Sequence, residues 1–407
     1  MDWSDSPEQK AFREDVSSFI QQRLPERYRD PDRGTGLFEG GWQSDRKSPD
    51  PDVQSAAQMW AAALAERGWI APHWPKQFGG AGLTVVEQFI FNHEMAKAGA
   101  PSVGGMGVSM LGPTLIVHGS PEQKAEHLPK ILSGEVAWAE GYSEPGAGSD
   151  LASLQTRAVR EGDEYVINGQ KIWTSGAQYA DWLFALVRTD PDAPKHRGIS
   201  FLVIDRNTPG ISIRPLTDMG WNQPFNETFF EDVRVPAKNR VGDENRGWYV
   251  GMTLLDFERS GIGTSVMARR QLQSLIDYAR TAEGRSKSQF VNNPALRLEA
   301  ADRHIEIEIE EAMSLRIVSI QAAGQIPNYE SSMVKMFGSE SLQRLQRLGT
   351  RAFGLYSNIW DEDDQHAPLR ATFTHGYIWS IPMTIAGGTS EIQRNIIATR
   401  GLGLPRG

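Results

Sequence analysis

The hydrophobic residues of this chain change their spacing twice along its 407 residues. Apolar positions recur at helical spacing at first, alternate with polar ones through a middle section, and then return to helical spacing. A period of 3.6 residues is typical of an amphipathic helix, and a period of two is typical of a half-buried strand. The order therefore predicts a mainly α-helical protein. An antiparallel β domain (136–241) is inserted between an N-terminal helical domain (1–135) and a C-terminal helical domain (242–407).

Helix starts are clearest in the N-terminal third of the chain. Ser120 precedes Pro121 and stands three residues before Gln123, which is the spacing of a capping box. Residues 28–52 instead carry Pro, Gly and Asp with little periodicity, which predicts a long exposed loop or an insertion. The helices expected here cover 1–27, 53–67, the stretch from Thr84 to about Ala98, 101–118 and a segment that starts after Ser120.

The middle section alternates in short runs, and the C-terminal section returns to helical patterns. The string from 305 to 309 alternates like a strand, but the longer stripe that continues to Ile320 favours a helix. The segment from Arg351 to Leu369 is irregular and acidic. The strands expected are 154–159, 164–168, 182–187, 199–204 and 226–235, and the later helices expected are 247–283, 295–323, 330–348 and 390–400.

Composition excludes several kinds of site. The chain has no Cys, which rules out disulfides and thiolate chemistry, and its eight His show no metal-ligand spacing, so no metal site is expected. A net charge of −9 argues against a nucleic-acid surface. No apolar run is long enough to span a membrane, and the acidic N-terminus lacks the basic region of a secretory signal, so a cytoplasmic protein is expected. Neither a Rossmann glycine motif nor a P-loop motif is present.

The stretch 138–176 has the composition of a ligand-binding loop. Pro145 fixes one backbone angle, while Gly146 and Gly148 allow the backbone to approach a ligand closely. Nearby serines supply short hydrogen-bond donors, and Trp173 offers a large flat face. A plain β-meander with glycine-rich turns explains the same pattern equally well.

A second stretch places a carboxylate on an apolar helix face. Leu254, Glu258 and Ile262 are four residues apart, so Glu258 projects from the apolar stripe. Burial would raise the pKa of such a carboxyl toward neutrality, which suits a general base. The alternative is an ion pair within the protein, for instance with Arg269 or Arg270.

A third stretch lies close to the C-terminus. Gly387 and Gly388 lead into Ser390, with Gln393 three residues further on, which again predicts a capping-box helix start. Backbone amides at the positive end of a helix suit a carbonyl oxygen or an anion. An ordinary helix cap is the alternative.

Together these stretches resemble the acyl-CoA dehydrogenase family over nearly the whole chain. The matching pieces are Tyr142 to Asp150, Gly162 to Trp173, Phe230 to Pro236 and Gly388 to Arg394. The ending from Asn395 to Arg406 is similar to bacterial members that act on bulky or branched acyl groups, including steroid side chains. The resemblance implies a helical bundle, a β-barrel and a four-helix-type bundle in that order, with FAD between the β domain and the C-terminal helices.

The resemblance also assigns roles to residues. Ser143 and Ser175 would bond the flavin ring, Trp173 would cover a ring face, and Ser149 would reach the pantetheine or phosphates of CoA. Implied cofactor positions are Tyr142, Ser143, Gly148, Ser149, Trp173, Ser175, Thr389 and Glu391. Implied substrate positions are Ser149, Asp256, Arg259, Gly387 and Gly388.

The reaction that this family carries out is α,β-dehydrogenation of an acyl-CoA thioester, with electrons passed to an electron-transfer flavoprotein. Most members place the catalytic Glu at the position of Gly387, which cannot abstract a proton but keeps the N–H that polarises the thioester oxygen. A minority, such as isovaleryl-CoA dehydrogenase, place the base on the earlier helix, at the position of Glu258. The resemblance and the apolar-stripe argument therefore meet at Glu258.

The chain lacks two sequence runs that bind the flavin of a neighbouring subunit in this family. The family's Arg-x-x-Phe-Gly run is missing, and Arg280 or Arg285 is the available substitute. The family's Gln-x-x-Gly-Gly-x-Gly run is replaced by Leu348 to Gly354. The expected assembly is a homotetramer or a heterotetramer of two related chains. Two alternatives remain open: a partner subunit with an altered or missing FAD site, and a relative with different acyl-CoA or flavin oxygenase chemistry.

Overall fold

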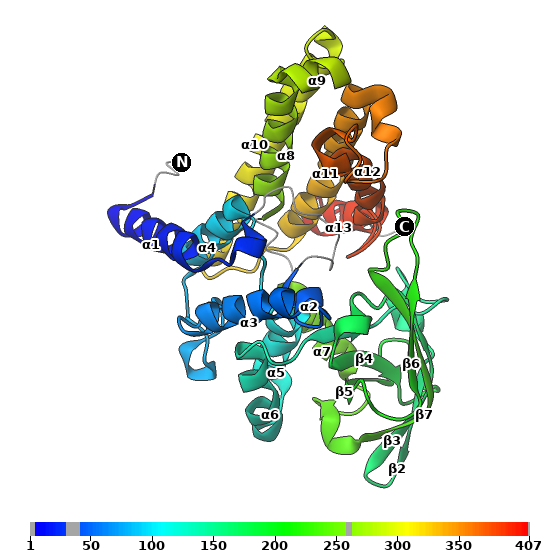
Figure 1. Ribbon diagram of the computed structural model, residues 1–407. Helices are drawn as coiled ribbons and strands as arrows, with labels where there is room; N and C mark the ends of the chain where they lie inside the picture. The colour runs from blue at the N-terminus through cyan, green and yellow to red at the C-terminus, as the bar shows by residue number, and fades with distance from the viewer. Residues whose placement is uncertain (1–4, 30–40, 258–262, 406–407) are drawn as a thin grey trace.

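The structure is a computed structural model that describes residues 5–29, 41–257 and 263–405, and only the backbone at 253–257 and 263. A β domain lies between two helical parts in chain order, as the change of period predicts (Figure 1). The N-terminal part contains α1 (Pro7–Arg23), α2 (Trp42–Asp45), α3 (Pro51–Ala65), α4 (Val85–Ala98), α5 (Gly112–His118) and α6 (Pro121–Leu132). A π-helical turn over Gly107–Leu111 leads into α5.

Side-chain caps start the N-terminal helices where the sequence predicts them. The Ser120 hydroxyl accepts a hydrogen bond from the Gln123 amide at the start of α6, and the Gln123 side chain accepts one from the Ser120 amide. Thr84 and Glu87 form the same capping box at the start of α4. These reciprocal bonds satisfy backbone donors that a helix start leaves without partners.

The prediction of an exposed loop over 28–52 is wrong for the part that the structure describes beyond residue 40. The short helix α2 lies there, and Trp42 at its start is buried. Asp45 is also buried, and accepts hydrogen bonds from Arg27 at 2.6 Å and from the Tyr28 hydroxyl at 3.0 Å. The helix α2 has only four residues, which is too short to show a helical period in the sequence. Tertiary contacts stabilise it instead.

The β domain is an eight-stranded sheet with the order β6-β7-β3-β2-β4-β5-β8, and β1 pairs with β4. All five predicted strands exist, although the first begins at Arg157 because a 3₁₀ turn precedes it. β1, β6 and β8 were not predicted, and the parallel pairing of β1 with β4 departs from a purely antiparallel sheet. The strands are β1 (Trp138–Gly141), β2 (Arg157–Glu161), β3 (Glu164–Lys171), β4 (Trp182–Arg188), β5 (Ile199–Asp205), β6 (Ile211–Leu216), β7 (Phe225–Pro236) and β8 (Arg240–Val241).

The central strands are buried on both faces. On β4, Leu183 and Ala185 pack in the core of the β domain, whereas Phe184 and Leu186 join the core of the N-terminal helices. Successive strand side chains point to opposite faces, so one strand contributes to two cores. The sheet is thereby fixed against the N-terminal helices.

The C-terminal part is a helical bundle. The helix expected over 295–323 is confirmed as α10, so the alternation at 305–309 does not form a strand. α11 runs on to Phe353, beyond the predicted end at 348, and α12 was not predicted because Gly376 and Pro382 interrupt its pattern. The bundle helices are α8 (Gly263–Arg280), α9 (Ala282–Lys287), α10 (Pro294–Ala322), α11 (Tyr329–Phe353), α12 (Thr372–Met383) and α13 (Ser390–Ile396). They are preceded by α7 (Gly247–Phe257), which packs against β5 and α5.

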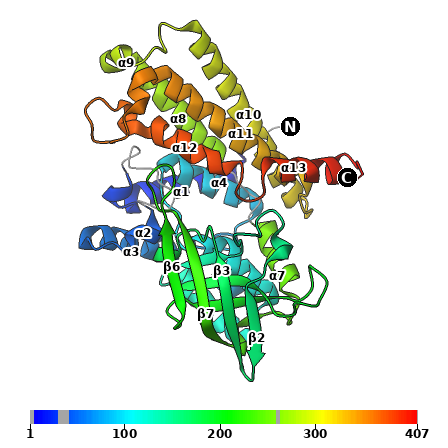
Figure 2. The same ribbon diagram turned by 90° about the vertical axis from the view of Figure 1, so that its right-hand side faces the viewer.

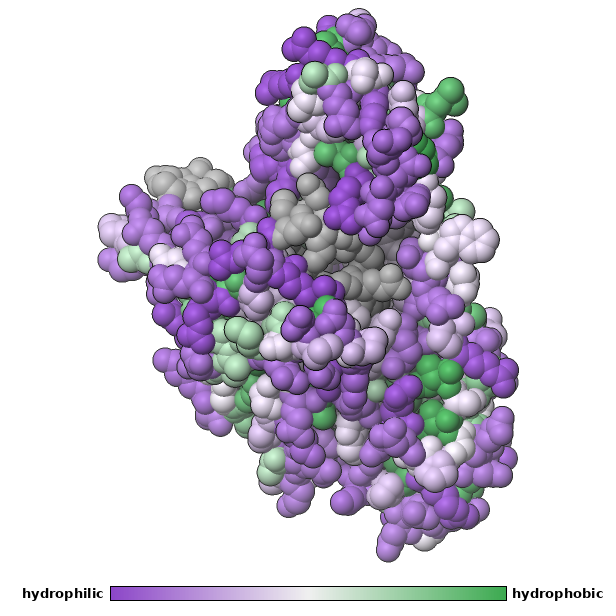
Figure 3. All heavy atoms as spheres, viewed as in Figure 1, coloured by the Kyte–Doolittle hydropathy of each residue, from purple (hydrophilic) through white to green (hydrophobic). Residues whose placement is uncertain are grey.

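α13 lies at the edge of this bundle nearest the sheet, and α9 lies at the opposite end (Figures 1 and 2). Hydrophilic side chains cover most of the face seen in Figure 3, with smaller hydrophobic groups over the sheet and the bundle. Within the ranges that the structure describes, no helix is long and apolar enough to cross a membrane.

Candidate active site

The loop after β1 is held by hydrogen bonds within its own backbone, and its outer side is exposed to solvent. The backbones of Glu144 and Ala147 exchange two hydrogen bonds of 2.9 and 3.0 Å, and the Ile172 amide donates to the Ser143 carbonyl at 2.9 Å. A Cβ placed on Gly146 or Gly148 would meet no described atom within 4 Å. The outer side of the loop therefore has room for a ligand close to its backbone.

A buried ion pair lies beneath this loop. The Lys171 side chain is fully buried, and its Nζ donates to the Glu144 carboxylate at 2.7 Å and to the Tyr142 carbonyl at 3.1 Å. Burial lowers the pKa of Lys171 to about 8, although the Glu144 carboxylate opposes the shift. Burial alone would raise the pKa of Glu144, but the charge and hydrogen bond of Lys171 hold that pKa below its ordinary value. This pair was not predicted from the sequence, because its two residues are 27 positions apart.

Trp173 presents its ring to solvent from a strained backbone position. Its side chain is 57% exposed and its φ is +60°, an uncommon conformation for a bulky residue. The rings of Phe225 and Trp173 are nearly perpendicular, with centroids 5.8 Å apart. The Ser175 hydroxyl points back to the Trp173 carbonyl at 3.4 Å. Strain of this kind is found at ligand sites, where the surrounding structure maintains it.

The helix α2 supports the segment that carries Ser175. The Gln43 side chain donates to the Gly176 carbonyl at 3.3 Å. Two cations of the same region, Arg46 and Lys47, each pair with Asp181 at 2.8 Å. Sequence reasoning missed this contact because it treated 28–52 as exposed.

The loop before α13 forms a bend whose carbonyls are tied down. Gly387 and Gly388 have φ angles of +62° and +88°, which favour glycine. The side-chain Nε2 of Gln393 donates to the Gly387 carbonyl at 2.9 Å, and the Lys335 Nζ donates to the Gly388 carbonyl at 2.7 Å. The helix cap is Thr389, whose hydroxyl accepts from the Ile392 amide. The prediction that Ser390 is the cap is therefore wrong by one residue.

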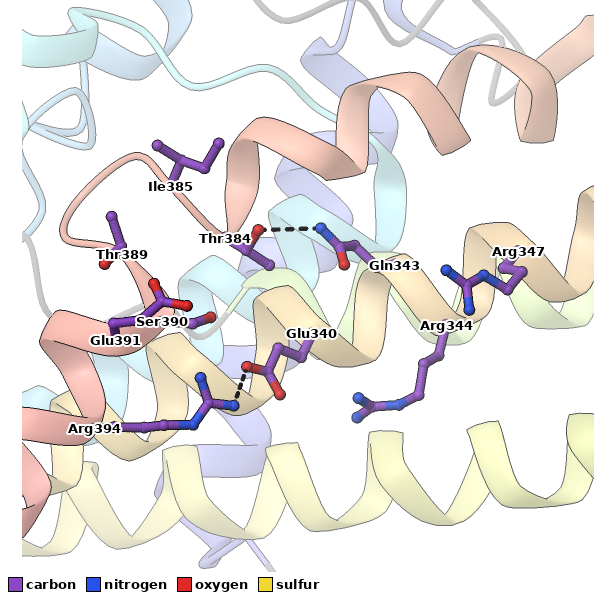
Figure 4. A pocket seen from close by; sticks show the side chains of 10 residues that line it. All are labelled: Glu340, Gln343, Arg344, Arg347, Thr384, Ile385, Thr389, Ser390, Glu391 and Arg394. Carbon is purple, nitrogen blue, oxygen red and sulfur yellow. Dashed lines mark hydrogen bonds and ion pairs between the residues drawn. The ribbon is translucent and has the colours of Figure 1, made fainter.

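Beside this bend lies a polar pocket of about 410 Å³ between α11 and α13 (Figure 4). An ion pair of 2.6 Å between Arg394 and Glu340 crosses it, and Gln343 donates to the Thr384 hydroxyl at 3.1 Å. Two of the predicted cofactor residues, Thr389 and Glu391, are part of its lining. Among the residues that the structure describes, no group of side chains could hold a metal ion.

Comparison with known proteins decides the family. The chain matches the family models of the acyl-CoA dehydrogenase N-terminal, middle and C-terminal domains over residues 6–135, 139–233 and 245–402. It is also 37% identical to acyl-CoA dehydrogenase FadE26 of Mycobacterium tuberculosis, over 85% of this chain and 87% of that protein. The chain belongs to the acyl-CoA dehydrogenase family. Members of this family are flavoproteins, generally FAD-dependent, and act as oxidoreductases on CH–CH groups.

Solved structures of the family have the same fold. The structure titled Tcur3481-Tcur3483 steroid ACAD matches with a TM-score of 0.84 and 32% identity, over the full length of both chains. The ChsE4-ChsE5 complex of Mycobacterium tuberculosis matches with a TM-score of 0.81 and 34% identity, also over both full chains. Mitochondrial isovaleryl-CoA dehydrogenase of Pongo abelii is 28% identical over 96% of this chain and 88% of that protein.

The structure describes some of the remaining predicted cofactor and substrate positions and not others. Tyr142 follows the last residue of β1, is buried and packs on Phe184, while Ser149 is exposed. The backbone of Asp256 lies in α7, but its side chain is not described, and Glu258 and Arg259 lie outside the described residues.

The two arginines offered as ion-pair alternatives for Glu258 have other partners. Arg269 pairs with Glu308 and Glu311 of α10, and the Arg270 guanidinium donates to the Ala96 carbonyl at 3.0 Å.

Arg280 and Arg285 lie apart from the other predicted cofactor residues. Arg280 ends α8 and lies 3.6 Å from Asp277, and Arg285 is in α9. Both therefore belong to the end of the bundle opposite α13 (Figures 1 and 2). Within one chain the structure does not bring them to the loop of Ser143 or to Trp173.

Proposed function

We propose that this protein is an FAD-dependent acyl-CoA dehydrogenase that converts an acyl-CoA thioester to the trans-2-enoyl-CoA. The observation that carries the proposal is the bend at Gly387 and Gly388. Gln393 and Lys335 bind both of its carbonyl oxygens from within the bundle. The Gly387 amide is then available to polarise a thioester oxygen, which becomes more negative as the α proton leaves.

The residues that the structure describes fit a flat cofactor with a dinucleotide tail. Trp173 offers an exposed aromatic face, and the open backbone at Gly146 and Gly148 allows close approach. Ser143 and Ser175 provide small polar groups near that face. The cofactor set is Tyr142, Ser143, Gly148, Ser149, Trp173, Ser175, Thr389 and Glu391. These residues would hold FAD, which would supply an acceptor for the hydride from the β carbon of the substrate.

The protein's own groups perform the proton chemistry. The carboxylate of Glu258 removes the α proton, as at the corresponding position of isovaleryl-CoA dehydrogenase. Gly387 leaves the family's usual base position without a carboxylate, so the Glu258 carboxylate is the base and the Gly387 amide the polarising donor. Ser149, Asp256 and Arg259 would hold the CoA part of the substrate.

The acyl group and the assembly are proposed from the relatives. A solved neighbour is titled a steroid ACAD, and the chain's ending resembles members that act on bulky acyl groups, so a bulky acyl-CoA of steroid side-chain type is proposed. Two neighbours are named as pairs of chains, which supports a heterotetramer. In such an assembly Arg280 or Arg285 would contact the flavin of a neighbouring subunit. An electron-transfer flavoprotein is the proposed electron acceptor.

Purified protein tests this function directly. We expect a flavin absorption spectrum that bleaches under anaerobic conditions when the right acyl-CoA is added, with an enoyl-CoA product two mass units lighter. A panel running from short branched to steroid acyl-CoAs identifies the substrate. A flavin-loaded protein that no acyl-CoA bleaches would refute dehydrogenation. A chain that binds flavin only together with a related subunit would support the heterotetramer.

A further inference from the structure

We propose that Lys171 is a positioning residue for the cofactor loop, which it holds in its flavin-binding shape through Glu144 and the Tyr142 carbonyl. The proposal rests on the proposed function, because it concerns the loop that would bind FAD. Lys171 itself is fully buried beneath this loop, so its role is to fix the backbone that carries Ser143 and Gly148.

The ion pair joins three segments of the chain. Lys171 ends β3, two residues before Trp173, and its Nζ bonds the loop at Tyr142 and Glu144. The Glu144 carboxylate in turn accepts the amides of Gln155 and Thr156 at 2.6 and 2.8 Å, just before β2. Charge-assisted hydrogen bonds are stronger than neutral ones, particularly where water is excluded. One buried pair therefore fixes the backbone of the loop relative to the end of β3, which leads to Trp173.

The pair makes the loop sensitive to pH. Glu144 and Arg188 are the charged groups that act on Lys171, the first stabilising its ammonium and the second disfavouring it. Arg188 comes from β4 and donates to the Ala152 carbonyl at 2.7 Å. Because burial outweighs the attraction of Glu144, Lys171 loses its proton above about pH 8, well before an exposed lysine would. Glu144 then has no adjacent ammonium, and the hydrogen bonds from Lys171 to the loop lose the charge that strengthens them.

A positioning role and a merely structural role give different measurements. If Lys171 only stabilised the fold, its replacement would lower the melting temperature without changing how flavin affinity depends on pH. If it positions the loop, flavin affinity must follow the charge of this one group. The dissociation constant of FAD for apoprotein, measured by fluorescence titration between pH 6.5 and 9.5, separates the two roles.

The experiment uses the full-length protein, with its related subunit if flavin binding requires one. We expect the wild-type affinity to fall above pH 8. The K171M variant should bind at least about tenfold more weakly at pH 7, with little dependence on pH. The K171R variant keeps a cation that does not titrate in this range, so its affinity should not fall above pH 8. In the E144Q variant the fall should begin at lower pH, because Lys171 loses the carboxylate that stabilises its charge.

The outcomes are distinguishable from failure of the proposed function. Wild-type protein that binds no flavin under any condition overturns the proposed function. Wild-type protein that binds flavin, with K171M showing the same affinity and the same pH profile, overturns the role of Lys171 alone. If K171M does not fold, the E144Q variant decides. A fall in its FAD affinity that begins at the same pH as in wild type would overturn the role of Lys171.

Discussion

The ring of Phe225 at the start of β7 stacks on the ring of Trp379 in α12, with centroids 6.0 Å apart and planes inclined by 21°. The ring of Trp173 contacts the same phenylalanine at nearly a right angle, with centroids 5.8 Å apart. Phe225 thus joins the sheet to the C-terminal bundle at the point where the flavin is expected. This contact links the position of Trp173 to the packing between the two parts.

Replacing Phe225 by Ala should loosen that junction. We expect the variant to lose about 2 kcal/mol of stability, since both aromatic contacts and a half-buried side chain are removed. Flavin content should fall as well, because Trp173 loses its support. Thermal melting and the flavin-to-protein absorbance ratio measure the two effects. F89A removes the same side chain from α4, so it should lower stability while leaving flavin content unchanged.

Removing the Gln393 side chain should impair turnover more than cofactor binding. Q393A leaves the Gly387 carbonyl without its 2.9 Å donor, so the bend can rotate and the Gly387 amide moves. Misplacement of a catalytic group by about 1 Å can cost a hundredfold, and we expect kcat to fall about tenfold to a hundredfold. Q88A on α4 also loses an amide-to-carbonyl bond, to Leu83, and should leave kcat unchanged. Equal kcat values in Q393A and wild type would show that the bend does not depend on Gln393.

The contact between α2 and the β domain should weaken in acid. Burial alone would raise the pKa of Asp181, but hydrogen bonds from Lys47 and Ala137 and the charge of Arg46 lower it. The carboxylate therefore stabilises the fold above its unfolded pKa and ceases to do so as the pH falls through its lower folded value. We expect D181N to be about 1–2 kcal/mol less stable than wild type at pH 7. This gap should narrow toward pH 3.5 in melting experiments, and a constant gap would exclude an ionic origin.

The effect of Glu310 on stability should depend on pH in the opposite direction to that of Asp181. It is buried in α10, its burial raises its pKa, and its Oε1 has no hydrogen-bond partner among the residues described. Because the folded state holds the proton more tightly than the unfolded state, the carboxyl destabilises the fold as the pH rises through this raised pKa.

The neutral variant E310Q should therefore melt higher than wild type at pH 8, by about 2 °C, with a smaller difference at pH 5. On the same helix, E308Q removes an ion pair to Arg269 that lowers the pKa of Glu308, so it should not melt higher than wild type.

The helix starts and the longer strands were predictable, because residues close together in the sequence determine them. The capping boxes at Thr84 and Ser120 start helices because side chains and amides three residues apart satisfy each other. The strands β3, β4, β5 and β7 follow a period of two or a short apolar run. β1 and β8 are short, and their pairing with distant strands could not be read from local spacing.

The candidate site was predictable only in part, for the same reason. Gly146 and Trp173 show by residue type that the backbone is open and an aromatic face is available. The burial of Lys171, the support of Gly176 by Gln43 and the binding of the Gly388 carbonyl by Lys335 are contacts between segments 29 to 133 residues apart. No local pattern encodes such pairs.

The most direct test concerns Glu258, which lies outside the described residues. If its carboxylate removes the α proton, E258Q should bind FAD normally and lose about 10²–10⁴-fold in the rate of flavin bleaching by a substrate acyl-CoA. E308Q, a change of the same kind on α10, should keep the wild-type rate. Stopped-flow absorbance under anaerobic conditions measures that rate. A wild-type rate in flavin-loaded E258Q would show that another group is the base.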